Sequence, residues 1–331
     1  MEQRTFGRTG LKLSLLGFGC GAVGGLFVQG EPREQERGLA RALELGINYF
    51  DTAAMYGMGA SEENLGRVLK SLKPDIVLGT KVRLADAEKR RIGEAIGASL
   101  EASLKRLGRE RVDLFQLHNP ITDAEGAGSL TPDVVLGEVV PAFERLRSQG
   151  KIGFFGITAV GDTGALKRVV EARAFASAQV VYNLLNPSAG GPIPAGFPAH
   201  DFGNLFAGTK AAGMGVIAIR ALAGGALSGS EARHPLGMPN IAPIASGRDY
   251  HADVERARRL LPLVHEGHAG GLVEAALRFV IANEAVTTML VGYSSLEQLE
   301  LAAAAVAKGP LSSAALERVR ALEQGFAGEK G

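Results

Sequence analysis

Residues Gly46 to Gly66 read G-I-N-Y-F-D-T-A-A-M-Y-G-M-G-A-S-E-E-N-L-G, and the rest of the chain can be interpreted outward from them. The apolar start, residues 47–50, predicts a short buried strand that delivers Asp51 to its carboxyl end. A glycine-broken loop then carries Tyr56, and the S-E-E that follows is typical of the first turn of a helix. Because ligands of parallel α/β folds collect at the carboxyl ends of the strands, this stretch predicts one wall of an active site.

Two later strands end on side chains of the same kind. Segments 75–81 and 112–118 read D-I-V-L-G-T-K and V-D-L-F-Q-L-H, and both patterns are typical of buried strands. Their last residues, Lys81 and His118, therefore stand at strand ends, as Asp51 does. Each of them alone could equally be a solvent-facing residue without a function. Three in succession favour a shared site at the carboxyl ends of the strands.

The composition fits a large α/β protein of a reducing, aqueous compartment. The chain has 331 residues, 46% of them hydrophobic, which is enough for a sizeable core. Lys plus Arg number 36 and Asp plus Glu 35, so the basic footprint of a nucleic-acid binder is missing. The single cysteine, Cys20, excludes an internal disulfide. Without an apolar run of about 18 residues or a signal-peptide pattern, we expect a cytoplasmic protein with no membrane partner.

Strand and helix patterns alternate along the chain. Gly7-Arg-Thr-Gly10 lies between two short mixed segments and predicts an N-terminal β-hairpin. Short strands rich in β-branched residues are predicted at 15–19, 47–50, 76–81, 112–118, 152–158, 178–183, 215–220 and 287–291. Helices are predicted at 33–45, 61–71, 89–107, 133–149, 162–174, 202–212, 251–266, 270–283, 295–307 and 311–324.

The eight predicted strands favour a closed barrel over a doubly wound sheet. No composition shift or linker divides the chain, so we expect a single domain over residues 1–331. The predicted fold is a (β/α)8 TIM barrel with an N-terminal β-hairpin and extra C-terminal helices. Two stretches rich in glycine and proline, 186–203 and 222–247, follow strand ends and would lie over the catalytic face as long functional loops.

Two motifs suggest other functions but lack the context that these need. Gly19-Cys-Gly-Ala-Val-Gly24 matches the G-x-G-x-x-G dinucleotide fingerprint, yet residues 25–32 are predicted as loop where the fingerprint needs a helix. A glycine turn that lets the backbone approach a ligand is the favoured interpretation. His265 and His268 are three residues apart, whereas the H-E-x-x-H zinc motif needs four. We expect a solvated helix end there and no metal site.

The three strand-end residues and Tyr56 form a plausible acid–base system. The phenol of a tyrosine ordinarily titrates near pH ~10, and a neighbouring Lys81 ammonium would lower that pKa. Asp51 would keep Lys81 charged and oriented. His118 could donate a hydrogen bond to a developing alkoxide. This set suits carbonyl reduction or alcohol oxidation with an external source of hydride.

The sequence resembles the aldo-keto reductase family over nearly its whole length. Gly46–Gly66 is similar to the first signature of the family, and 98–107 with 112–118 is similar to the second. Residues 151–158 and 179–183 are similar to its fifth and sixth strands. The resemblance implies that Tyr56 is the general acid–base, that Lys81 and Asp51 tune it, and that His118 orients the carbonyl.

The resemblance also implies a nicotinamide cofactor that lies across the barrel end. We place its contacts at Gly19, Asp51, Thr158, Gln179, Arg220, Leu222, Gly292, Ser294 and Gln298. Thr158 and Gln179 would bind the carboxamide, although either side chain could instead satisfy buried backbone groups. Residues 291–298 contain no Lys or Arg to bind a 2′-phosphate. NADP(H) is expected first, following the family, and NAD(H) remains possible.

Three functions stay open at this stage. The first is reduction of an aldehyde or ketone to an alcohol, and the second is NAD-dependent oxidation of a sugar or related alcohol. The third is that of a non-catalytic, cofactor-binding regulatory subunit, which the intact catalytic set disfavours. We expect a small-molecule substrate, which loops 119–132, 186–203 and 223–250 would select. The sequence predicts neither the substrate nor the oligomeric state.

Overall fold

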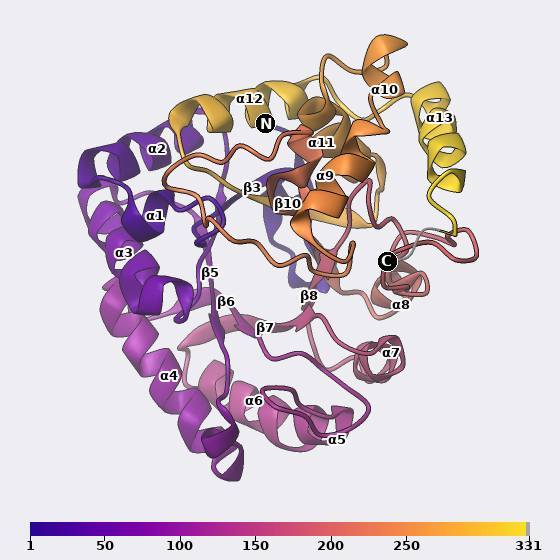
Figure 1. The fold of residues 1–331 in the computed structure, drawn as a ribbon. Helices are drawn as coiled ribbons and strands as arrows, with labels where there is room; N and C mark the ends of the chain where they lie inside the picture. Colours follow the sequence, from indigo (N-terminus) through magenta and orange to yellow (C-terminus); the bar gives the residue numbers. More distant parts are fainter. Residues whose placement is uncertain (329–331) are drawn as a thin grey trace.

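A closed barrel of eight parallel strands forms the centre of the computed structural model, which describes residues 1–328. Around the barrel the strands follow in the order β10-β3-β4-β5-β6-β7-β8-β9, so each strand pairs with its neighbour in the sequence (Figure 1). Their bounds are β3 Leu16–Gly19, β4 Tyr49–Asp51, β5 Val77–Val82, β6 Val112–Leu117, β7 Ile152–Ala159, β8 Ser177–Val181, β9 Gly215–Ile219 and β10 Val286–Gly292. The predicted TIM barrel is confirmed.

The predicted N-terminal hairpin is also confirmed, and it closes the amino end of the barrel. Strands β1 (Gln3–Thr5) and β2 (Lys12–Ser14) pair antiparallel, and a 3-10 turn, η1 (Gly7–Thr9), lies between them. A buried cluster there consists of Phe6, Leu13, Tyr49, Leu114 and Ile217. The Phe6 ring lies so close to Gly215 that a Cβ there would come within 2.2 Å of it. The barrel is therefore plugged at this end, and ligands must enter at the carboxyl ends of the strands.

Helices surround the barrel, as Figure 1 shows. The α-helices are α1 Leu26–Gln29, α2 Pro32–Glu44, α3 Ala60–Leu72, α4 Ile92–Leu107, α5 Pro132–Val134, α6 Val140–Ser148, α7 Thr163–Glu171, α8 Leu205–Ala211, α9 Tyr250–Arg258, α10 Pro262–His265, α11 Leu272–Ala282, α12 Leu296–Ala307 and α13 Ser313–Gln324. The other helical turns are η2 Tyr56–Gly59, η3 Asp86–Arg90, η4 Val135–Val139 and η5 Ala223–Ser228. None of the helices in residues 1–328 combines the length and apolar character that crossing a membrane requires.

The predicted elements differ from the structure mainly at prolines and glycines. The helix predicted at 251–266 is two helices, α9 and α10, because Pro262 starts a new helix at its first turn. The helix predicted at 133–149 contains a π-helical turn, η4, just before Pro141, whose missing N–H interrupts the α-helical ladder. The loop predicted at 25–32 contains the four-residue helix α1. None of these differences moves a strand end.

The two long loops meet over the carboxyl ends of the strands. Asn186, in the loop after β8, donates hydrogen bonds to the carbonyl of His200 at 2.9 Å and to that of Ala245 at 2.5 Å. Ala245 belongs to the loop after β9, so a single buried amide ties both loops together. The predicted position of the long loops is confirmed.

Candidate active site

Three side chains that the sequence predicts as catalytic form one hydrogen-bonded chain. Asp51 ends β4 and Lys81 lies in β5, and the two form an ion pair inside the barrel. The Lys81 ammonium also donates to the Tyr56 hydroxyl at 3.3 Å and to the carbonyl of Thr52 at 2.7 Å. Parallel pairing of β4 with β5 fixes this geometry, because it sets Asp51 beside the strand that carries Lys81.

Asp51 is buried, with 2% of the residue exposed, and its carboxylate accepts three side-chain hydrogen bonds. Besides Lys81, the donors are the Tyr49 hydroxyl at 2.9 Å and the Gln179 amide at 2.8 Å. Burial lowers the pKa of Lys81, but Asp51 and Tyr56 more than offset this, so that the pKa is raised overall. Lys81 is therefore held as an ammonium.

Burial raises the pKa of Tyr56 above its ordinary value. The charges of Lys81 and Arg220 act in the opposite direction and do not outweigh the burial. The sequence-based expectation of a lowered Tyr56 pKa is therefore right for the Lys81 contribution and wrong for the sum. The reason is desolvation, which depends on packing around the ring. At neutral pH the Tyr56 hydroxyl keeps its proton.

His118 follows β6 and lies beside Tyr56 with its ring at 84° to the tyrosine ring, 5.8 Å between centroids. Burial lowers its pKa to about 3, helped by the charges of Lys81 and Arg83. The imidazole is thus neutral and keeps one N–H to donate. Its Nδ1 atom is buried and has no hydrogen-bond partner within residues 1–328. The structure therefore brings all four predicted catalytic residues to one place.

The glycine turn after β3 passes close to Tyr56 and to the residues at the end of β10. A Cβ on Gly21 would lie 3.3 Å from the Tyr56 ring, and one on Gly24 would lie 2.2 Å from the backbone nitrogen of Tyr293. The approach of this turn to a ligand stays a prediction, and Gly21, partly exposed, lies beside Tyr56. The two glycines let the chain pass close to Tyr56 and to β10.

Tyr49 and Arg83 are neighbours of the predicted catalytic residues that the sequence patterns did not indicate. Tyr49 precedes Asp51 by two residues in β4, and Arg83 follows Lys81 by two residues at the end of β5. Side chains two apart in a strand lie on the same face. That alternation, applied to each strand end, would have found both residues.

The predicted cofactor residues are distributed around the carboxyl ends of β3 and β7–β10. Thr158, 5% exposed, has a hydroxyl without a hydrogen-bond partner in the described chain, which suits an incoming polar group such as a carboxamide. Arg220 has a positive φ of 58° and makes one weak contact, from Nη1 to the carbonyl of Ala242 at 3.4 Å. Leu222 directly precedes η5. These residues fit a nicotinamide dinucleotide.

Other predicted cofactor contacts are already used by the protein. The Ser294 hydroxyl donates to the carbonyl of Gly24 at 2.5 Å, and the Ser294 N–H donates to the Gln298 side chain at 2.8 Å. A Cβ on Gly19 would come 3.2 Å from the carbonyl of Val291, and one on Gly292 would come 3.1 Å from the backbone of Gly24. Both glycines therefore allow close packing of β3 and β10.

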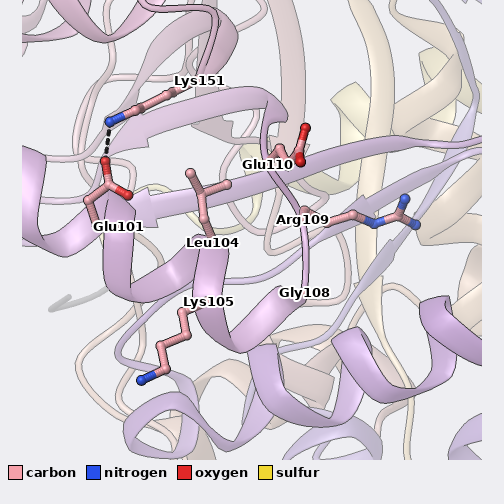
Figure 2. A pocket seen from close by; sticks show the side chains of 7 residues that line it. All are labelled: Glu101, Leu104, Lys105, Gly108, Arg109, Glu110 and Lys151. Atoms are coloured by element: carbon pink, nitrogen blue, oxygen red, sulfur yellow. Dashed lines mark hydrogen bonds and ion pairs between the residues drawn. The ribbon is translucent and has the colours of Figure 1, made fainter.

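Two hollows on the surface are lined by none of the four predicted catalytic side chains. The one in Figure 2, about 400 Å³, lies along α4 and the start of β7, and its rim carries the ion pair between Lys151 and Glu101. The other, about 500 Å³, lies between the two long loops and is lined by residues 196–200 and 245–247. The loop hollow is on the side where substrates would enter.

The histidines predicted to have no metal role occupy surface positions. His265 ends α10, and His268 pairs with Glu266 at 3.5 Å. His251 lies with Glu231 and Glu255, their ligand atoms all within 4.8 Å of one another and all three residues exposed. Its Nδ1 hydrogen-bonds Glu231 at 2.8 Å. Such exposed groups gather without an ion, and none of them faces the catalytic set.

Comparison with known proteins agrees with the geometry. The aldo/keto reductase family model matches residues 15–324. The chain is 30% identical over 314 residues to L-galactose dehydrogenase of Arabidopsis thaliana, covering 92% of this chain and 88% of the relative. It is 27% identical over 335 residues to L-glyceraldehyde 3-phosphate reductase of Escherichia coli K12, covering 91% and 86%. The holo form of aldo-keto reductase AKR11C1 from Bacillus halodurans superposes with a TM-score of 0.71 at 27% identity, over 99% of this chain and 96% of that one.

Fold and matches together define a (β/α)8-barrel oxidoreductase. More particularly, the chain belongs to the aldo/keto reductase family. The family generally uses nicotinamide cofactors and acts on small molecules.

Proposed function

We propose that the protein reduces an aldehyde or ketone to an alcohol with a nicotinamide cofactor, and that Tyr56 is the proton donor. The observation that carries this proposal is the chain from Asp51 through Lys81 to Tyr56 beside a neutral His118. In such a set the Tyr56 hydroxyl carries a proton that it can donate at neutral pH. The neighbouring Lys81 ammonium stabilises the phenolate that remains.

The residues act on a carbonyl oxygen placed between Tyr56 and His118. The neutral imidazole donates a hydrogen bond that orients the carbonyl and stabilises negative charge as it develops on the oxygen. A bound reduced nicotinamide would supply the hydride to the carbonyl carbon. Tyr56 gives its proton to the oxygen, and the Lys81 ammonium stabilises the resulting phenolate. Since burial keeps Tyr56 protonated at neutral pH, the site favours reduction there.

The cofactor contacts proposed for this reaction lie around the strand ends. Thr158 and Gln179 would hold the carboxamide, and Arg220 would provide a cation for the phosphates. Gly19, Leu222, Gly292, Ser294 and Gln298 complete the set, and Ser294 and Gln298 would have to exchange hydrogen bonds that they make within the protein. Residues 291–298 bring hydrogen-bond donors but no cation, so NADP(H) comes first by only about tenfold over NAD(H), which is on the order of 1.4 kcal/mol. Dissociation constants for NADPH and NADH, from fluorescence quenching, test this; a preference above about a hundredfold for either contradicts it.

Tyr56→Phe tests the catalytic assignment directly. The variant keeps the ring that packs against Gly21 and loses only the hydroxyl. A general acid–base contributes roughly 10²–10⁴-fold, so kcat should fall by that factor while the NADPH dissociation constant stays unchanged. A variant that keeps more than about a tenth of wild-type kcat would show that the proton comes from elsewhere.

Oxidation of a sugar alcohol or hemiacetal is the second candidate, because one relative is named a dehydrogenase of L-galactose. The same residues serve in reverse, with Tyr56 as the base. A panel of aldehydes, ketones and sugars, assayed in both directions with both cofactors, separates the two. Higher kcat/KM for sugar oxidation at neutral pH than for any carbonyl reduction would favour the dehydrogenase.

A further inference from the structure

We propose that Arg83 binds an anionic group of the substrate, so that the preferred carbonyl compounds carry a carboxylate or a phosphate near the carbonyl. This inference rests on the proposed function, because it places the carbonyl at Tyr56 and His118. It assigns Arg83 to substrate specificity and leaves the proton transfer to the other residues.

Arg83 stands beside His118 at the carboxyl ends of two neighbouring strands. It directly follows Val82, the last residue of β5, and lies two residues beyond Lys81. The β5–β6 register ends with Val82 paired to Leu117, so Arg83 and His118 are the residues that directly follow the last pair. A hydrogen bond from the His118 N–H to the carbonyl of Val82, at 2.8 Å, continues the ladder to this level.

The guanidinium of Arg83 lies at the rim of the site. Its Nη2 atom would be 3.4 Å from a Cβ on Gly128, which belongs to the loop that follows His118. Its charge is close enough to His118 to help lower the pKa of that ring. Arg83 thus lies between the substrate-selecting loop and the residue that would bind the carbonyl oxygen.

The hydrogen-bond donors of the Arg83 guanidinium are available to a ligand. The side chain is exposed and makes no hydrogen bond or ion pair with any residue of the described range 1–328. Its nearest acidic neighbour in the sequence, Asp86, pairs with Lys89 at 2.6 Å and accepts from the Gly128 N–H at 2.9 Å. A free guanidinium fork suits a carboxylate or a phosphate, which it can bind through two parallel hydrogen bonds.

The charges around the site point the same way. Lys81 is balanced by Asp51, whereas Arg83 and Arg220 add positive charge near His118 and Tyr56. A cleft lined by one sign of charge raises the local concentration of oppositely charged ligands. A single exposed arginine is ordinary on a protein surface. An unpaired arginine next to the proposed carbonyl-binding imidazole is a specificity element.

Matched substrate pairs test the proposal. Succinic semialdehyde with butanal examines a carboxylate, and glyceraldehyde 3-phosphate with glyceraldehyde examines a phosphate. The enzyme is compared with Arg83→Met, which removes the charge and keeps the stem, and with Arg83→Lys, which restores the charge without the fork. Arg90→Met, an exposed arginine on η3, is the control for loss of one surface charge.

We expect kcat/KM of Arg83→Met to fall about 10- to 100-fold for the anionic member of at least one pair, mainly through KM, as loss of a charge-assisted hydrogen bond predicts. The neutral members should change less than about twofold, and Arg83→Lys should recover part of the loss. The pair that responds identifies carboxylate or phosphate. Equal losses for neutral and anionic members, or a similar loss in Arg90→Met, would overturn the proposal.

Binding keeps this test independent of turnover. Calorimetry with succinate and with inorganic phosphate, on the wild type saturated with NADPH, should show binding of at least one anion that Arg83→Met weakens about tenfold or more. If the wild type turns over no member of either pair but this difference holds, the reductase proposal fails and the anion site stands. If turnover of the neutral substrates is normal and neither anion distinguishes the variants, only the anion site fails.

Discussion

Two ion pairs lie on opposite faces of β5. One includes Lys81, and the other contacts the adjacent strand residue, Thr80. Lys81 points into the barrel and pairs with Asp51, and their side chains are 0% and 3% exposed. Thr80 points outward and donates to Glu62 at 2.5 Å, and Glu62 pairs with Arg106 at 2.6 Å with side chains 0% and 24% exposed. Both pairs have a buried carboxylate, so burial of the acidic partner does not separate a functional pair from a structural one.

The difference lies in what each pair leaves unpaired. Both Glu62 oxygens accept hydrogen bonds, and the stem of Arg106 lies 2.9 Å from where a Cβ on Gly59 would be, so this pair fills its site. The inner pair extends to the Tyr56 hydroxyl, next to a His118 with an unpartnered Nδ1 in the described chain. Buried polar groups without a hydrogen-bond partner, next to a charge, are typical of functional sites, and they favour the inner face of the strand as the functional one.

Lys81→Met should give the largest effect, because it breaks the inner pair at its charged centre. Without the ammonium, the Tyr56 phenolate loses its main stabilising charge and only the smaller contribution of Arg220 remains. The kcat for carbonyl reduction should therefore fall by roughly 10²–10⁴. Since Lys81 lowers the pKa of Tyr56, its removal raises that pKa further. In the oxidation direction, where Tyr56 must lose its proton, the rise of rate with pH should move to higher pH. Steady-state pH profiles measure this shift. A profile that does not move would show that Lys81 does not influence the pKa of Tyr56.

Arg106→Met breaks the outer pair and should affect stability instead. Removing one partner of a buried pair costs about 3–5 kcal/mol, and the partial exposure of Arg106 places the cost at the lower end. Urea unfolding monitored by circular dichroism measures it. At temperatures where the variant is folded, kcat should remain within about threefold of wild type. A large fall in kcat of the folded variant would show that the outer pair also positions Tyr56.

The inner pair was predictable from sequence and the outer pair was not. Asp51, Lys81 and His118 could be predicted because each follows or ends a buried strand pattern. Parallel pairing of the strands then brings the three residues to the same end of the barrel. Glu62 and Arg106 lie on two helices, 44 residues apart, where charged residues are ordinary and only the packing of α3 against α4 joins them. The raised pKa of Tyr56 was missed for a related reason, because desolvation is a property of the assembled site. The fold and the meeting of the proposed catalytic residues thus follow from local sequence pattern, while burial energies do not.

Glu323, on α13, is a buried carboxyl that has no arginine or lysine to pair with among residues 1–328. It is 7% exposed, and its Oε1 has no hydrogen-bond partner within residues 1–328. Burial raises its pKa to about 7, against a smaller lowering by Arg320. The folded protein therefore holds a proton that the unfolded chain has already released between about pH 4.5 and 7. Stability consequently falls as pH rises through that window.

Glu323→Gln should have the smallest effect of the three, and the opposite sign to Arg106→Met. The amide carries no charge to bury, so the variant should be more stable than wild type at pH 8, by at most about 3 kcal/mol. Near pH 4.5 or below, where wild-type Glu323 is protonated when folded, the difference should vanish. Urea unfolding at pH 8 and pH 4.5 measures both values, with Glu317→Gln, an exposed position on α13, as the control. A Glu323→Gln protein less stable than wild type at pH 8 would mean that this carboxylate is stabilised in place, as Glu62 is, and that an unpartnered oxygen does not distinguish the two sites.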